Sequence, residues 1–228
     1  MTRSEMKRAA KDQLRGNWLW AVGLSLVGAL VTYLLQDLQS FMETGHDRIY
    51  YIVKNYPYIT DYELNWAADL SGIIIGTLSG LIFWGIAYTI LNFRDRGEKP
   101  NIFAGIFSAF RGERFNSSFI ALILVELYIF CWSLLFFVPG IIKSYSYAMT
   151  PYILEDMYQS GQKVSASEAI TRSRNLMKGH KMDLFVLDLS FIGWALVGIL
   201  TCGIGLIWIT PYIRQTRANF YRNLTDME

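Results

Sequence analysis

The sequence predicts an all-α integral membrane protein, a six-span helical bundle that forms a single domain over residues 1–228. Three observations predict this class. Hydrophobic residues make up 53% of the chain and are gathered into long blocks. A four-residue motif recurs three times, and the positive charges fall on alternate connecting segments. We therefore expect three units, each a cytoplasmic interfacial amphipathic helix followed by a transmembrane hairpin.

Three apolar runs define the first three predicted spans, at residues 18–35, 70–91 and 117–138. They contain one formal charge between them, Glu126. Each run is long enough to cross a hydrocarbon core of roughly 30 Å as a helix. The first run exceeds the apolar core of a signal peptide and no small-x-small cleavage site follows it, which indicates that it is retained.

A fourth apolar run covers residues 184–213 and is too long for one untilted span. Small residues typical of a turn interrupt it: Gly198, Thr201, Cys202, Gly203 and Gly205. It is therefore interpreted as a hairpin of two spans, at about 183–199 and 203–219.

The recurring motif is an apolar residue, a cation, a glycine and a polar residue, and it occurs at residues 14–17, 110–113 and 177–180. A cation and a left-handed glycine are typical of a helix C-terminus, so each motif predicts the end of a short helix. Capping boxes at Thr2–Glu5 and Ser165–Glu168, and Pro100 in a first turn, predict the starts. The expected apolar faces are Met6, Ala9, Ala10 and Leu14; Ile102, Phe103, Ile106, Phe107 and Phe110; and Ala166, Ala169, Ile170, Ser173 and Met177.

The repeat divides the chain into units at about 1–91, 100–156 and 165–221. In the second unit it predicts an outer turn at Pro139 and Gly140, followed by a fourth span at 141–156. Lys143 would then reach the outer interface. In the first unit it predicts a tyrosine-rich extracytoplasmic loop at 36–69.

The distribution of charge favours this topology. With six spans, 18 of the 21 Lys and Arg residues lie on one side, which the positive-inside rule makes cytoplasmic. Both termini would then be cytoplasmic, in a multipass protein of the plasma membrane. A five-span alternative leaves 139–183 outside and treats 184–213 as one crossing, which gives 13 cations inside against 8 outside. The six-span arrangement fits better.

Ionisable residues inside spans are costly and are candidates for function. Glu126, Asp188 and Arg214 are expected near one depth, in the inner half of the bundle. They could form a polar pocket or a proton-responsive gate. The favoured interpretation is plainer: an ion pair between the fifth and sixth spans, with Glu126 protonated or bonded to a tyrosine.

Two further sets of residues are candidates for packing and lipid contact. Gly72, Gly76 and Gly80 form a doubled G-x-x-x-G in the second span, which suits close packing within the monomer or, alternatively, a homodimer seam. Cations on the cytoplasmic side could contact anionic lipid headgroups: Lys11, Arg15, Arg111, Arg114, Arg174 and Lys178.

Several classes of function are not expected. The chain has no nucleotide-binding loop, serine-hydrolase elbow, zinc-protease motif or C-x-x-C, so neither an enzyme nor a cofactor is predicted. Cys131 and Cys202 lie in apolar segments and are interpreted as small buried residues, and no metal site is predicted. The basic residues are spread over four membrane-proximal segments, which argues against a nucleic-acid partner.

The second half of the chain resembles a group of uncharacterised integral membrane proteins common in Gram-positive bacteria, domain of unknown function 975. The matching residues run from 139 to 221: Pro139-Gly140-Ile141, Tyr145, Tyr147, Tyr152-Ile153-Leu154, Glu168-Ala169-Ile170, 176–180, 189–194, 201–205, Pro211-Tyr212 and Phe220-Tyr221. The group is similar in organisation to a membrane domain fused to some bacterial glycerophosphodiester phosphodiesterases, which implies a lipid-linked context by analogy.

Two functions are therefore expected. The first is the binding, export or flipping of a lipid or other amphiphile, with membrane lipids as partners. The alternative is a membrane scaffold or regulator, with a membrane-protein partner, that protects against envelope stress or antimicrobial peptides. A lipid-modifying enzyme is a weaker third.

Overall fold

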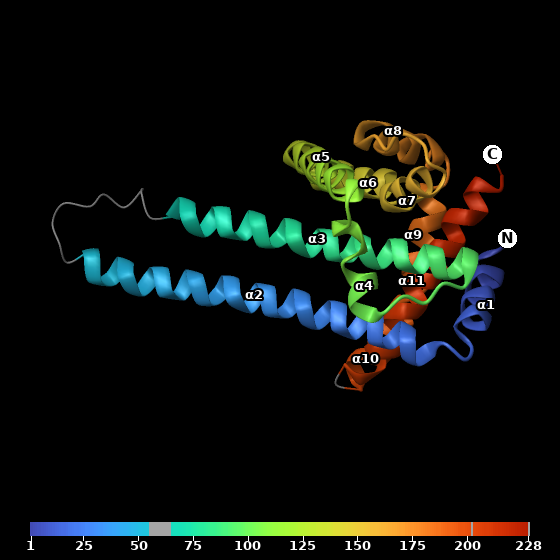
Figure 1. Ribbon diagram of the computed structural model, residues 1–228, viewed down its shortest axis with the longest axis horizontal. Coiled ribbons are helices and arrows are strands. Elements are labelled where there is room, and N and C mark those ends of the chain that lie inside the picture. The colour runs from blue at the N-terminus through green and yellow to red at the C-terminus, as the bar shows by residue number, and fades with distance from the viewer. Residues whose placement is uncertain (55–64, 202, 228) are drawn as a thin grey trace.

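The computed structural model describes residues 1–54, 65–201 and 203–227, with side chains at 1–41, 70–201 and 203–227. All regular structure in these ranges is helical (Figure 1). In chain order the elements are α1 (Arg3–Leu14), α2 (Trp18–Lys54), α3 (Asn65–Arg96), α4 (Ile102–Ile106), the 3-10 helix η1 (Ser108–Phe110), α5 (Glu113–Leu135), α6 (Phe137–Tyr147), α7 (Thr150–Gln159), α8 (Ala166–Leu176), α9 (Lys181–Leu189), α10 (Ile192–Leu200) and α11 (Ile204–Thr225).

Short helices alternate with helical hairpins along the chain. Helix α1 precedes the pair α2/α3, α4 and η1 precede α5/α6, and α8 precedes α9, α10 and α11. Gly16, Gly112 and Gly179 have φ of 78°, 50° and 91°. Each motif glycine therefore has a positive φ, which favours glycine. Gly112 nevertheless departs from the prediction, because its ψ of −130° lies outside the left-handed helical region and it is the N-cap of α5.

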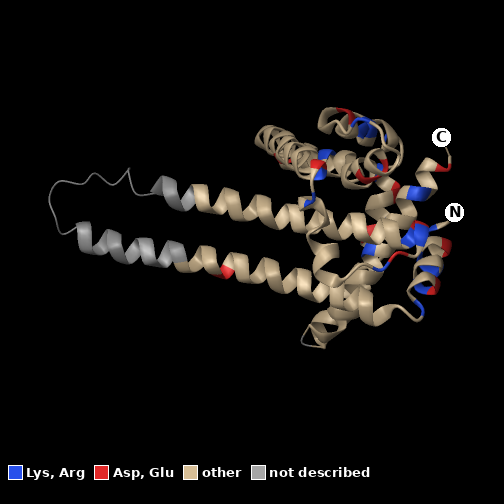
Figure 2. Ribbon diagram, in the orientation of Figure 1, with Lys and Arg blue, Asp and Glu red and all other residues tan. Residues whose placement is uncertain are grey.

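Among the described residues, many charged residues gather at one end of the molecule, where both termini also lie (Figure 2). We call this end the base; it comprises α1, α7, the C-terminal end of α3 and the C-terminal half of α11. Helix α11 packs on both α1 and α3 there. The N-terminal amine donates a 2.5 Å hydrogen bond to Asn223 Oδ1.

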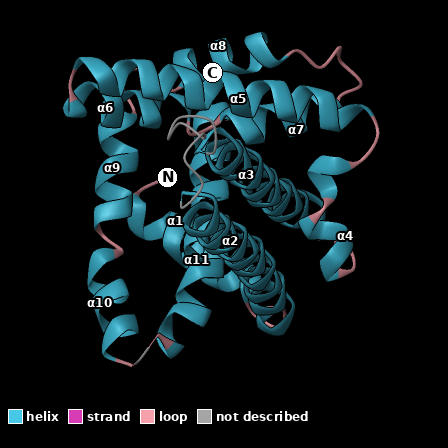
Figure 3. Cartoon of the chain, turned by 90° about the vertical axis from the view of Figure 1, so that its left-hand side faces the viewer, coloured by secondary structure: helices cyan, strands magenta, loops and turns pink. Residues whose placement is uncertain are grey.

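The hairpins leave the base in different directions. In Figure 1 the α2/α3 hairpin extends along the long axis, whereas α5 is seen foreshortened. Figure 3, turned by 90°, shows α5 and α6 lying across the view, and α9 and α10 running nearly at right angles to them. The arrangement differs from the bundle that the sequence predicts. Hydropathy identifies apolar helices but does not say which neighbours cover them.

Four helical segments are long and apolar enough to cross a membrane: Trp18–Phe41, Leu70–Arg96, Glu113–Leu135 and Lys181–Leu200. At most 44% of the residues in their most apolar stretches are buried, so most of these side chains face outward. An outward-facing apolar surface of this extent is expected of a membrane protein rather than of a soluble one. The chain thus has the composition of a membrane protein.

The other two predicted spans have a different form. Residues 141–156 are divided between α6 and α7, with a break at Ala148 and Met149 just before Pro151, which occupies the first turn of α7. All of residues 203–219 except Gly203 lie within α11, which continues to Thr225 and carries several arginines. Neither segment is among the four apolar candidates.

The predicted loop at 36–69 is wrong for most of its length. Helix α2 continues to Lys54 and α3 begins at Asn65, which leaves only residues 55–64, outside the described backbone. The fall in hydropathy after residue 35 marks the end of the apolar run but not the end of the helix. Polar residues such as Gln36 and Gln39 are good helix formers. The tyrosine side chains predicted for this loop lie outside the described residues.

The predicted outer turn is also displaced. The chain reverses at Phe136, whose extended backbone separates α5 from α6. Pro139 and Gly140 instead lie in the first turn of α6, where proline forfeits no intrahelical hydrogen bond. A Cβ at Gly140 would overlap Ser133 of α5, so this glycine lets the two helices approach closely.

The short helices are packed on protein. The capping box of α1 is confirmed, since Glu5 N donates to Thr2 Oγ1 and Thr2 N to Glu5 Oε2. Its residues Met6, Ala10 and Leu14 are buried, and α1 packs on α11. This apolar face was expected at a lipid boundary, but it covers another helix. Amphipathicity alone does not distinguish these two partners.

The second and third motif helices also depart from prediction. Ile106 is buried beside α3, but Phe103 and Phe107 are exposed. The whole predicted apolar face of α8 is buried. Its predicted capping box is absent, because Ser165 makes no capping hydrogen bond and Glu168 pairs with Arg172 at 2.7 Å.

Candidate functional site

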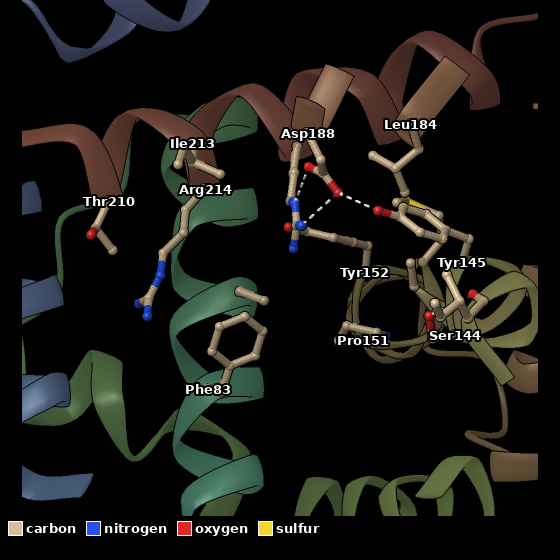
Figure 4. A pocket seen from close by; sticks show the side chains of 15 residues that line it. Phe83, Ser144, Tyr145, Pro151, Tyr152, Leu184, Asp188, Thr210, Ile213 and Arg214 are labelled. Atoms are coloured by element: carbon tan, nitrogen blue, oxygen red, sulfur yellow. Dashed lines mark hydrogen bonds and ion pairs between the residues drawn. The ribbon is translucent and has the colours of Figure 1, made fainter. Parts of the chain in front are cut away.

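A cavity of about 570 Å³ lies between parts of all three hairpins. It is lined by Phe83 and Ala87 of α3; Ile141, Ser144 and Tyr145 of α6; Ala148 and Met149; Pro151 and Tyr152 of α7; Leu184 and Asp188 of α9; and Thr210, Ile213, Arg214 and Arg217 of α11 (Figure 4). Its volume lies within the roughly 300–1,000 Å³ typical of small-molecule sites.

One part of the cavity wall is an ion pair between α9 and α11. Arg217 donates from Nε to Asp188 Oδ1 at 3.0 Å and from Nη2 to Oδ2 at 2.8 Å. The Tyr145 hydroxyl donates a longer hydrogen bond, 3.4 Å, to Oδ2. The two parallel bonds from one guanidinium fix the carboxylate firmly. Asp188 is thus fully occupied by groups of the protein.

Arg214 lies in the same cavity but does not share this carboxylate. Figure 4 shows its side chain directed away from Asp188, toward Phe83. The guanidinium carbon is 5.1 Å from the centre of the Phe83 ring. Its Nη1 is buried and has no hydrogen-bond partner in the described part of the chain. The favourable contact with the ring does not use this N–H donor.

The remaining wall is largely apolar. Phe83, Ile141, Met149, Leu184 and Ile213 supply most of it. Buried Tyr152 stacks on Tyr221 with ring centres 5.3 Å apart, which fixes the position of its ring. The cavity therefore presents fixed charges beside an apolar surface.

The structure brings together two of the three residues of the predicted polar cluster. Asp188 and Arg214 line one cavity, but Glu126 is exposed on α5 and does not line it. Depth along a span does not fix the direction in which a side chain points, and α5 leaves the base away from α9. The missed residue is Arg217, the partner of Asp188. Arg217 follows Arg214 by three residues, so the two arginines share one face of a helix. This spacing could have identified Arg217 from the sequence.

The three glycines of α3 do not form one packing surface. Gly72 faces Gln39 of α2, Gly80 faces Leu122 of α5, and Gly76 has no other side chain nearby among the described residues. The closest approach lies elsewhere on α3: a Cβ at Gly85 would overlap the carbonyl oxygen of Ile106. A periodic glycine motif shows that close contact is permitted but not which helix makes it.

Five of the six predicted lipid-contacting cations are exposed: Lys11, Arg15, Arg111, Arg174 and Lys178. Arg114 is instead largely buried and pairs with Glu155 at 3.2 Å. Arg174 helps to line a second cavity of about 350 Å³ together with Lys143, whose Nζ lies 4.2 Å from the Trp132 ring centre. Cys131, predicted to be buried, is exposed among the described residues, and Cys202 lies outside them.

A second charged cluster joins three helices at the base. Arg222 of α11 donates to Asp95 of α3 and to Asp156 of α7, with Nη1 2.6 Å from Asp156 Oδ2. Burial lowers the pKa of Arg222, but its hydrogen bonds to Asp156 and Asp95 outweigh burial and raise that pKa overall. The Tyr221 hydroxyl also donates to Asp156. Both carboxylates are satisfied, so this cluster holds the base together rather than offering a ligand site.

Comparison with known proteins gives a family but no characterised relative. The sequence profile of a family described as "Protein of unknown function (DUF975)" matches residues 1–145 and 137–228. No curated protein and no solved structure matches the chain. Because these two matches together cover the chain from end to end, the protein belongs to the DUF975 family.

Proposed function

We propose that this protein is a multipass plasma-membrane protein that binds a lipid or another amphiphile, without chemical conversion, in the cavity between α3, α6, α7, α9 and α11. One observation carries the proposal. The cavity combines fixed guanidinium groups with an apolar wall, and it lies where apolar hairpins meet a charged base. A site for an amphiphile needs both features: a charged group that binds the polar part of the ligand and an apolar wall that contacts its apolar part.

In this proposal the base lies at the cytoplasmic face and the hairpins enter the bilayer from it. The four apolar segments and their outward-facing side chains support placement in lipid. The collection of Lys and Arg at the base supports the cytoplasmic assignment. Six crossings, with both termini cytoplasmic, keep every motif helix on the same side.

The test is the retention of lipid by the full chain. Purification in a mild uncharged detergent, followed by native mass spectrometry, should show a bound amphiphile at about one per chain. Ser144→Phe fills the cavity and should abolish retention. Gly76→Phe adds the same side chain where the described structure is open, and it should leave retention unchanged.

A bare protein, or equal retention by both variants, would contradict amphiphile binding in this cavity. A bare protein that co-purifies with another membrane protein would favour the scaffold or regulator that the sequence also suggests. That outcome should depend on the exposed cations of α1 and α8 rather than on Ser144.

A further inference from the structure

The cavity contains one more positive group than negative groups. Its charged side chains are Arg214, Arg217 and Asp188. Asp188 accepts two hydrogen bonds from Arg217, and its remaining neighbour in the cavity is the Tyr145 hydroxyl. No carboxylate is therefore left for Arg214.

The excess positive charge of the cavity includes one identifiable hydrogen-bond donor that has no acceptor. Arg214 Nη1 is buried and has no acceptor among the described residues. Tyr152 lines the same cavity, and its hydroxyl has no hydrogen bond to a described residue. A buried guanidinium donor without an acceptor is strongly unfavourable, and an anionic oxygen ligand would satisfy it.

We propose that Arg214 binds the anionic group of the ligand, a carboxylate or phosphate carrying one negative charge, while the wall around Phe83 and Ile141 takes the first part of the attached chain. This inference rests on the proposed function and narrows it to anionic amphiphiles. Asp188 does not bind the ligand. It neutralises Arg217 and so limits the cavity to one anion.

The experiment compares three probes on the full chain in an uncharged detergent: phosphatidylglycerol, with one negative charge; phosphatidylcholine, whose phosphate is balanced by a cation; and inorganic phosphate. Binding is measured by native mass spectrometry and by the shift in unfolding temperature. The wild-type protein should prefer phosphatidylglycerol to phosphatidylcholine by at least about tenfold. The phosphate of phosphatidylcholine can still accept the hydrogen bond from Arg214, but its choline group brings a second positive charge close to Arg214 and Arg217.

Two cavity variants should act in opposite directions. Arg214→Gln should remove the preference and should raise the unfolding temperature of the ligand-free protein, because a partly buried cation with one buried, unpaired N–H donor has been removed. Asp188→Asn should strengthen binding of phosphatidylglycerol, because Arg217 is released as a second cation. Arg8→Gln removes an exposed cation of α1 outside the cavity and should change neither quantity.

Each contrary result has a distinct meaning. Equal binding of the two lipids by the wild-type protein would overturn the anion site but leave amphiphile binding intact. Retention of neither lipid would overturn the proposed function as well. Inorganic phosphate binding as tightly as phosphatidylglycerol would make the ligand a free anion and overturn the lipid assignment. If Arg214→Gln does not fold, weaker phosphatidylglycerol binding by Asp188→Asn would overturn the inference.

Discussion

Arg114 and Glu155 form a buried ion pair, with Nη2 of Arg114 3.2 Å from Oε1 of Glu155 and the two side chains only 14% and 1% exposed. The pair joins the first turn of α5 to α7. Asn92 of α3 and Gln159 of α7 donate to the same oxygen, at 2.8 and 2.6 Å. One carboxylate therefore connects three helices at the base.

Replacing Arg114 by methionine should destabilise the protein strongly. The change leaves Glu155 without a cation in a buried position, and we expect a loss of about 3–5 kcal/mol of unfolding free energy. Reversible unfolding in mixed micelles measures it. Arg172→Met breaks an exposed pair with Glu168 and should cost less than about 1 kcal/mol. Similar losses for both variants would contradict the special role of the buried pair.

Replacing Arg222 by lysine should loosen the base locally. A lysine presents a point charge and cannot donate to Asp95 and Asp156 in the planar geometry of guanidinium. Hydrogen exchange at α7 and the end of α11 should show opening made easier by about 1–2 kcal/mol. Arg96→Lys is the matched control, because among the described residues Arg96 pairs with exposed Glu98, at 3.7 Å. Unchanged exchange in Arg222→Lys would show that α11 is held by apolar packing alone.

Two glycines of α3 should respond differently to alanine. At Gly85 the new Cβ would overlap the backbone of Ile106, so Gly85→Ala should cost about 1–3 kcal/mol as α4 and η1 are displaced. At Gly76 nothing lies within 4 Å, and Gly76→Ala should be neutral or stabilise by up to about 1 kcal/mol through helix propensity. Thermal unfolding of both variants tests whether Gly85→Ala is the less stable of the two. If Gly76→Ala were the less stable, the close contact between Gly85 and Ile106 would be excluded.

Cysteine labelling tests the topology. In a chain with Cys131 and Cys202 replaced by alanine, Ser165→Cys lies at the start of α8 and Phe137→Cys at the tip of the α5/α6 hairpin. An impermeant maleimide added to intact cells should label Phe137→Cys but not Ser165→Cys, and permeabilisation should expose both. Labelling of Ser165→Cys in intact cells would rule out the six-span arrangement.

Much of the local structure was predictable from the sequence. The apolar runs locate the long helices because hydropathy reports the transfer of a segment into lipid. The motif glycines locate three residues with a positive φ because few other residues adopt such a backbone. Asp188 and Arg214 could be expected together because both are costly in an apolar segment.

The direction of each hairpin could not be predicted in this way. It depends on contacts between units, such as Gly85 against Ile106, that no periodicity encodes. The same limit explains the choice of Arg217 over Arg214 as the partner of Asp188, and the exposure of Glu126. In each case the sequence indicates how far along a span a polar residue lies. The packing of the other helices decides which residues its side chain contacts.

The divergence of the hairpins gives the cavity an unusual mechanical position. Each hairpin contributes part of the wall, with Phe83 from the first, Tyr145 from the second and Asp188 from the third. Because these three parts of the wall belong to hairpins that leave the base in different directions, a small rotation of any one hairpin would displace one side of the cavity relative to the other two.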